Sequence, residues 1–224
     1  MADKLSAIGI AAAVILTGCT KQNAESEPVE VEEIVVAQED EGMVLDIKVP
    51  EVEGQDAFNE QALRLGEELE AQIKQSEQAV VEGETDLHAE GELDFETKFL
   101  DNQTISVLLD GFYYQAGAAH GVSYKETLNY ELQSGSAIEI AELFEEENYE
   151  DDLLAAANQK MEASGLKEDL SWPFDQIKEE QQFYLTEEKL VLVFDQSEIT
   201  SGYMGTQEVA IPKSELENLK DIYK

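Results

Sequence analysis

Residues 87–99 read LHAEGELDFETKF, and this stretch decides the fold class because its side chains alternate between apolar and polar. The apolar members, which would share one face of an extended chain, are Leu87, Ala89, Leu93, Phe95 and Phe99. A period of two residues predicts a strand with one buried face. Asp101-Asn102 then predicts a turn, after which residues 104–115 return as a second strand. The stretch therefore begins an antiparallel sheet.

Hydrophobic patterns on both sides of this hairpin predict the remaining elements. Strands are expected at residues 43–49, 122–132, 183–185, 190–194 and 207–211. Helices are expected at residues 55–78 and 146–164 and from Ser214 onward. Pro50 is expected to end the first strand, and Glu217 to complete a capping box with Ser214. The order β-α-β-β-β-α-β-β-β-α predicts an α+β fold, a mainly antiparallel sheet with helices packed on one face.

The N-terminus carries the features of an export signal, predicted to span residues 1–18. Ile8 to Leu16 are nine apolar residues, a length that suits a signal peptide and is too short to span a bilayer. Leu16-Thr17-Gly18-Cys19 resembles the bacterial lipobox, which implies cleavage before Cys19 and lipidation of its thiol by palmitate-type chains. The alternative is a short membrane helix with a chance cysteine, but no apolar run follows Cys19 before Val29 to extend it. The chain is therefore predicted to be a lipoprotein.

The charge of the chain narrows the classes of partner. Residues 20–42 carry a net charge of −7 and are predicted to form an acidic tether behind the lipidated Cys19. Residues 43–224 carry −30, so the acidity is spread over the folded part. Such a surface repels nucleic acids and attracts cationic proteins, peptides and divalent ions. The alternative is a surface that serves solubility alone.

The search for chemistry singles out one short stretch. No P-loop, dinucleotide fingerprint, nucleophile elbow or calcium loop is present, and no cofactor or metal site is predicted. The stretch YQAGAAHG, residues 114–121, places small residues between aromatic strands, and Tyr114, Gly117 and His120 are candidate ligand-binding residues. The alternative for His120 is a half-buried histidine that hydrogen-bonds within the loop. No catalytic residue is predicted.

This stretch also resembles a known family. Tyr114 with Gly117-Ala118-Ala119-His120-Gly121 is similar to the signature of the paired domains DUF4163 and DUF3298. Residues 129–144 and 207–216 resemble later segments of the same family, whereas residues 196–202 depart from its Tyr-rich, Pro-containing pattern. The resemblance implies a DUF4163-like region at 43–117 and a DUF3298-like region at 118–224.

The resemblance also implies a place and a role. Such domains occur in the extracellular region of an anti-sigma factor that senses lysozyme, ahead of peptidoglycan deacetylase domains, and in envelope lipoproteins. The chain matches the last setting, on the outer membrane or periplasmic face where a cell has two membranes, and otherwise on the outer face of the cell membrane. The predicted function is a non-enzymatic module that binds peptidoglycan or a cationic protein such as lysozyme. The alternatives are an enzyme that acts on cell-wall glycans, with His120 and nearby carboxylates, and a purely structural envelope protein.

Overall fold

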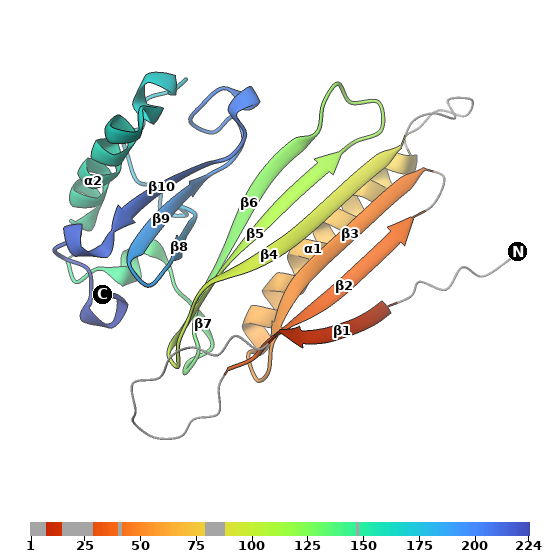
Figure 1. Cartoon of the computed structure of the whole chain (residues 1–224), viewed down its shortest axis with the longest axis horizontal. Coiled ribbons are helices and arrows are strands. Elements are labelled where there is room, and N and C mark those ends of the chain that lie inside the picture. The colour runs from red at the N-terminus through yellow and green to blue at the C-terminus, as the bar shows by residue number, and fades with distance from the viewer. Residues whose placement is uncertain (1–7, 15–28, 40–41, 79–87, 147) are drawn as a thin grey trace, which may run out of the picture. The chain divides into compact units, whose positions relative to one another are not determined.

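The computed structural model describes the chain apart from residues 1–7, 15–28, 40–41, 79–87 and 147 (Figure 1). The strands are β1 (Ile8–Val14), β2 (Val31–Glu39), β3 (Met43–Val52), β4 (Ala89–Leu100), β5 (Thr104–Tyr114), β6 (Val122–Glu131), β7 (Ser136–Ala137), β8 (Phe183–Leu185), β9 (Lys189–Phe194) and β10 (Gln207–Pro212). The α-helices are α1 (Asp56–Gln78) and α2 (Tyr149–Ser164). Short 3-10 turns are η1 (Ile140–Leu143), η2 (Leu166–Asp169), η3 (Gly202–Met204), η4 (Lys213–Glu215) and η5 (Asp221–Tyr223). The α+β class is confirmed.

The strands form two sheets, with hydrogen-bonded neighbours in the orders β1-β2-β3-β4-β5-β6-β7 and β10-β9-β8. Strands β3 and β4 are parallel, while β2/β3, β8/β9 and β9/β10 are antiparallel. The mainly antiparallel character is confirmed, but the expected single sheet is two. In the part of the chain that the structure describes, no helix combines the length and the hydropathy needed to cross a bilayer.

The chain divides into two compact units, each discontinuous in sequence. Unit 1 comprises residues 1–95 and 109–122, and unit 2 comprises residues 96–108 and 123–224. Strands β4 and β5 therefore contribute one part to each unit. The two candidate sites described below lie in different units.

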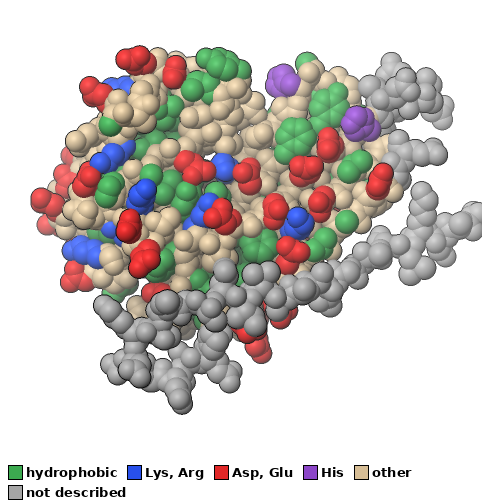
Figure 2. All heavy atoms as spheres, viewed as in Figure 1, with side chains coloured by type: hydrophobic (Ala, Val, Ile, Leu, Met, Phe, Trp, Pro, Cys, Tyr) green, Lys and Arg blue, Asp and Glu red, His purple; other side chains and the backbone are tan. Residues whose placement is uncertain are grey.

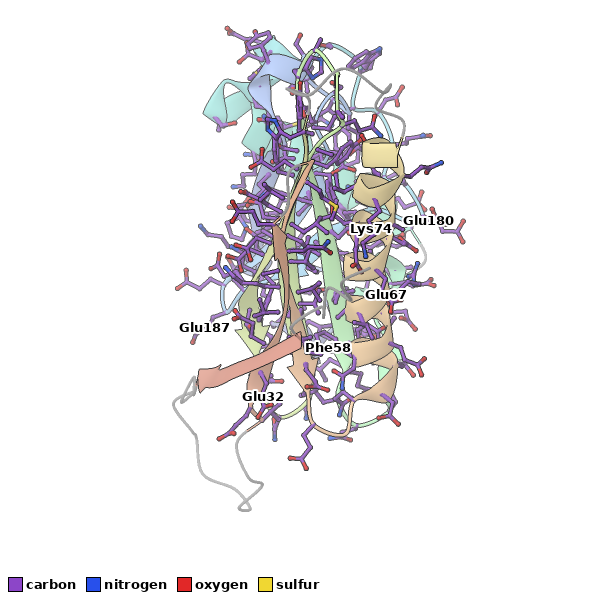
Figure 3. All side chains as sticks on the ribbon, turned by 90° about the vertical axis from the view of Figure 1, so that its right-hand side faces the viewer. Glu32, Phe58, Glu67, Lys74, Glu180 and Glu187 are labelled. Carbon is purple, nitrogen blue, oxygen red and sulfur yellow. The ribbon has the colours of Figure 1, made fainter. Side chains whose placement is uncertain are left out.

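In unit 1, α1 packs on β3 through the apolar stripe that the sequence predicts. Phe58, Ala62 and Ile73 of α1 are fully buried against the strands, and Figure 3 shows Phe58 between the helix and the strands. Gly66 allows this close approach, because a Cβ there would lie 3.1 Å from Ile47 Cγ2. The helix also supplies the crossover that the parallel pair β3/β4 requires.

Two expectations for the N-terminal half are wrong. Residues 31–39, expected within the tether, form β2, because Ile34 and Val36 pair beside the buried Val49 and Ile47 of β3. Strand β3 continues through Pro50 to Val52. Its pairing with β4 ends at Ile47, so the missing N–H of proline removes no ladder bond on that side.

In unit 2, α2 packs on the sheet β10-β9-β8. Leu153, Ala157 and Met161 of α2 share one core with Leu192 and Phe194 of β9. Gly165 ends α2 in the left-handed conformation, at φ 83°, as predicted. The helix expected from Ser214 is wrong, since the segment forms only the short turns η4 and η5.

Candidate functional site

Of the three residues singled out from the sequence, Tyr114 ends β5, and Gly117 and His120 lie in the loop between β5 and β6. Gly117 takes the left-handed conformation, at φ 80°, which glycine adopts without strain. The Tyr114 hydroxyl donates to the Ala118 carbonyl at 2.9 Å, and the Ala116 N–H donates to Ser76 Oγ of α1 at 2.9 Å. Tyr114 and Gly117 therefore shape the loop and fasten it to α1.

His120 is exposed and not half-buried as the alternative expected, although it does hydrogen-bond within the loop. Its Nδ1 lies 3.0 Å from the Gly121 carbonyl oxygen. Because a carbonyl only accepts, Nδ1 carries the proton and Nε2 of the neutral ring is left as an acceptor. His88 is exposed too, with its ring 5.8 Å from that of Tyr114. Figure 2 shows both histidines beside hydrophobic side chains on one face.

Gly121 is the second glycine of the stretch, and its surroundings leave no room for a side chain. A Cβ at this position would overlap the Phe112 ring and lie 3.2 Å from the Tyr113 carbonyl oxygen. The Phe112 ring and the Tyr113 carbonyl thus pack closely against the backbone directly after His120. Within the described ranges, no three His, Cys, Asp or Glu side chains gather to hold a metal ion. The predicted lipidation site, Cys19, lies outside the described residues.

A second candidate surface, in unit 2, was not predicted. Residues 195–202 form a loop that hydrogen bonds from its own side chains fix in place. Asp195 Oδ1 accepts the Lys125 N–H at 2.9 Å, Gln196 Oε1 accepts the Ser123 N–H at 2.8 Å, and Gln196 Nε2 donates to the Gly202 carbonyl at 2.7 Å. Ser197 within the loop has φ 69°, a conformation that side chains rarely adopt outside constrained sites.

One exposed aromatic residue follows this loop, and a second lies on a segment bonded to it. Tyr203 is 88% exposed, and Trp172 on the neighbouring segment is 53% exposed. The two segments are joined because the Ser171 N–H donates to the Ile199 carbonyl at 2.9 Å and the hydroxyls of Ser171 and Ser201 lie 3.0 Å apart. We call Trp172 and Tyr203 the aromatic surface. The sequence distinguished residues 196–202 only as a departure from the family pattern, and the exposure of their neighbours did not follow from it.

An acidic hollow of about 540 Å³ begins at the same loop. Its lining residues are Lys178, Glu179, Glu180, Gln181, Gln182, Val193, Asp195 and Glu198. Lys178 forms an ion pair with Glu198. Burial raises the pKa of the Asp195 carboxyl, and the N–H of Lys125 opposes this only in part.

A third polar cluster, on the face of the small sheet opposite α2, is structural. Glu208 of β10 accepts the Tyr184 hydroxyl at 2.7 Å and pairs with Lys125 Nζ at 3.2 Å. Burial raises the pKa of Tyr184, and its hydrogen bond to Glu208 adds to the effect. Burial alone would raise the pKa of Glu208, but Tyr184 and Lys125 outweigh it and the pKa is lowered. Tyr184 is thus kept protonated and Glu208 ionised. In these states the hydrogen bond between them and the ion pair of Glu208 with Lys125 join the strands.

Comparison with known proteins places the chain among envelope-related relatives. Residues 123–214 match the family described as Protein of unknown function (DUF3298), in agreement with the resemblance seen in the sequence. The chain is 25% identical over 203 residues to the anti-sigma-V factor RsiV of Bacillus subtilis, covering 83% of this chain and 68% of RsiV. It is 28% identical over 170 residues to the peptidoglycan-N-acetylmuramic acid deacetylase PdaC of the same organism, covering 72% of this chain. The chain spans only 35% of PdaC.

Two solved structures share the fold. A DUF3298 family protein from Pseudomonas aeruginosa superposes with a TM-score of 0.65 at 14% identity, covering 87% of this chain and 96% of the other. A DUF3298 family member from Bacteroides fragilis superposes with a TM-score of 0.62 at 15% identity, covering 86% and 94%. These likenesses establish the fold. The DUF4163-like assignment of residues 43–117 stays a prediction.

Proposed function

We propose that this protein is a non-enzymatic binding module of the bacterial cell envelope and that its ligand is a cationic protein such as lysozyme. The observation that carries the proposal is Tyr203, 88% exposed directly after a loop that its own side chains hold rigid. The relationship to RsiV, whose family the sequence resemblance connects with lysozyme sensing, supports this partner.

The physical argument combines the aromatic surface with the charge. Tyrosine and tryptophan dominate binding energy at protein interfaces because they bury much area and lose little conformational entropy. A loop that is already ordered loses less entropy on binding than a flexible one. The charge of −30 over residues 43–224 would steer a basic protein toward the surface and raise the association rate.

Binding of lysozyme by biolayer interferometry over a salt series tests the proposal. We expect Tyr203→Ala to weaken binding about tenfold or more, which corresponds to about 1.4 kcal/mol. Ile222→Ala is the matched control, because Ile222 is 59% exposed in the same unit and lies outside the aromatic surface. A basic protein unrelated to lysozyme serves as a control for charge alone. No binding of lysozyme even at low salt would overturn the proposal.

The surface around His120 favours a second candidate ligand, a cell-wall glycan. Its exposed imidazole, with Nε2 as an acceptor, lies in a loop shaped by Tyr114 and Gly117, and aromatic rings and acceptors are the groups that bind sugars. Muropeptide profiles after incubation with peptidoglycan distinguish an enzyme from a binding module. Profiles that change with the wild type and not with His120→Ala would contradict the non-enzymatic proposal.

The proposal includes a lipid anchor at Cys19 and a tether. Because β2 begins at Val31, the tether would comprise residues 20–30. An anchored position in the envelope would put the aromatic surface where an attacking basic protein is met. We expect palmitate labelling of the wild type in a bacterial host and none of Cys19→Ser. Equal labelling of the two proteins would refute the anchor without affecting the binding proposal.

A further inference from the structure

Strand β1 is the outermost strand of the larger sheet. Its backbone pairs antiparallel with that of β2, with Ile8 beside Val36, and Figure 1 shows β1 along the margin of the sheet. β1 falls within residues 1–18, the predicted export signal. Cleavage before Cys19, which belongs to the proposed function, would remove β1. In the mature chain β2 would then be the edge strand of the sheet.

The sequence of β2 lacks the features that usually protect an edge strand. Natural edge strands carry lysine, proline or a bulge, which prevent another chain from pairing with them. β2 reads VEEIVVAQE and pairs with β3 residue by residue, without a shift of register. Four consecutive apolar residues, Ile34 to Ala37, occupy its centre. Without β1, β2 would therefore present a regular row of backbone N–H and C=O groups to another strand.

The sequence of β2 is complementary to itself in the antiparallel direction. Two copies related by a twofold axis at Val35 would pair along the whole strand. The residues that would face each other are Val31 and Glu39, Glu32 and Gln38, Glu33 and Ala37, and Ile34 and Val36. No acid faces an acid in this register, and β-branched residues meet at its centre, which is the combination that stabilises an antiparallel pair. An axis at Val36 would instead place Glu33 opposite Glu39.

We infer that the mature chain forms a homodimer in which the β2 strands of two copies pair antiparallel across a twofold axis. The inference rests on the cleavage before Cys19 that the proposed function includes, and it adds a second copy of the chain as a partner. A twofold interface uses the same surface of both copies, so the self-complementary sequence of β2 favours a second copy over an unrelated strand. One strand pair is smaller than a standard interface of about 1,200–2,000 Å², so we expect a dissociation constant in the micromolar range.

The charge of the chain gives this dimer a salt dependence of its own. Residues 43–224 of each copy carry −30, so two copies repel each other, and added salt screens the repulsion. Because the contacts along β2 are apolar and backbone hydrogen bonds, salt does not weaken them. We therefore expect dimerisation to strengthen with salt, whereas binding of a cationic protein weakens.

Analytical ultracentrifugation of two chains, both with Cys19→Ser, tests the inference. One chain comprises residues 19–224 and the other residues 1–224, which retain β1. We expect the shorter chain to dimerise at micromolar concentration and the longer chain to stay monomeric, because β1 covers the edge of β2. A shorter chain that is monomeric at millimolar concentration, or equal dimerisation of both chains, would overturn the inference. So would loss of cooperative thermal unfolding in the shorter chain, since β1 would then belong to the fold.

Variants of Ala37 in the shorter chain test the register. Ala37 is exposed and would lie opposite Glu33 of the second copy, twice in each dimer. We expect Ala37→Lys to strengthen dimerisation at least fivefold and Ala37→Glu to weaken it at least fivefold, because unlike charges attract and like charges repel in directly opposite pairs. Leu63→Lys and Leu63→Glu are the matched controls, since Leu63 is exposed on α1 and lies outside β2. Equal effects at the two positions would show net charge alone at work and overturn the pairing of β2.

Lysozyme binding by the shorter chain distinguishes the inference from the proposed function. If the chain is monomeric and binds lysozyme, the homodimer fails and the proposed function stands. If it dimerises and does not bind lysozyme, the proposed ligand fails and the homodimer stands. A synthetic peptide of residues 8–14 identifies another occupant of the edge. A monomeric chain that binds this peptide would show that β2 accepts a strand other than its own copy, and it would overturn the homodimer.

Discussion

At the scale of single residues, Glu208 makes the sharpest prediction. Glu208→Gln should destabilise the protein by about 1–3 kcal/mol, because Lys125 is only 9% exposed and would lose this ion pair. The pKa of Glu208 is lowered in the folded protein, so its contribution is present above its ordinary pKa of 4.5 and disappears as the pH falls through the lowered value. Urea unfolding of both proteins between pH 7 and pH 3 measures this. Glu168→Gln is the control, and a difference that stays constant across the pH range would contradict the assignment.

Gly121 makes a second prediction at this scale. Gly121→Ala should destabilise the protein by about 1–3 kcal/mol, because the added methyl group would overlap the Phe112 ring. Phe112→Leu in the same background should recover part of the loss by removing the ring edge. Thermal unfolding followed by circular dichroism measures both effects. Equal melting temperatures of Gly121→Ala and the wild type would show that Phe112 moves away freely.

At the scale of elements, a short buried network closes the edge of β8. Ser106 Oγ accepts the Leu185 N–H at 2.8 Å and donates to Asn129 Oδ1 at 2.5 Å, while Asn129 Nδ2 donates to the Phe183 carbonyl at 2.7 Å. Side chains of β5 and β6 thus take the place of a further strand. Without them, the edge would leave buried backbone groups unpaired.

The network predicts that losing its buried hydrogen bonds costs more stability than losing an exposed one nearby. Ser106→Ala should cost about 1–3 kcal/mol, because it leaves the buried Leu185 N–H and Asn129 Oδ1 without a partner. Thr186→Ala, beside the same strand at an exposed hydrogen bond, should cost less than about 1 kcal/mol. Chemical unfolding measures both variants, and equal losses would show that burial of the network contributes nothing.

Elements with a strong period could be predicted from the sequence, and elements that depend on a neighbour could not. Strand β4 and helix α1 begin and end close to the predicted residues because alternation and the 3.6-residue stripe are local signals. Strand β2 has four acidic or amide residues among nine, and its apolar members gain burial by pairing beside β3. The C-terminal segment has a helical start signal, but backbone bonds from Glu145 to Asn218 and from Lys220 to Leu143 hold it extended between its 3-10 turns.

The candidate sites also differ in how far the sequence alone predicts them. Tyr114, Gly117 and His120 could be selected because small residues between aromatic strands stand out locally, and the structure brings them into one loop. Tyr203 and Trp172 are 31 residues apart, and their segments become neighbours only through bonds such as that from Ser171 to Ile199. Exposure is a property of the folded chain, so no sequence pattern could show it.

At the scale of the whole molecule, the two units alternate along the sequence, so neither is one continuous stretch of chain. Residues 96–108 belong to unit 2, although the DUF3298 match begins at residue 123. A fragment of residues 123–224 would lack Ser106 at the β8 edge and Phe99 against the core. We expect this fragment to lack cooperative unfolding in calorimetry, and the chain from residue 96 onward to regain it in part. A sharp transition of the short fragment would show that residues 96–108 are dispensable.

The charge of the whole molecule acts in opposite directions on folding and on binding. A net charge of −37 makes the compact state repel itself, and added salt screens this repulsion. We therefore expect the melting temperature to rise by several degrees between 10 and 500 mM NaCl at neutral pH, whereas the affinity for a cationic protein falls over the same range. Calorimetry and biolayer interferometry in the same buffers measure the two trends. If both quantities fell with salt, ion pairs such as that of Lys125 with Glu208 would outweigh the repulsion, and the acidity would serve the fold more than the partner.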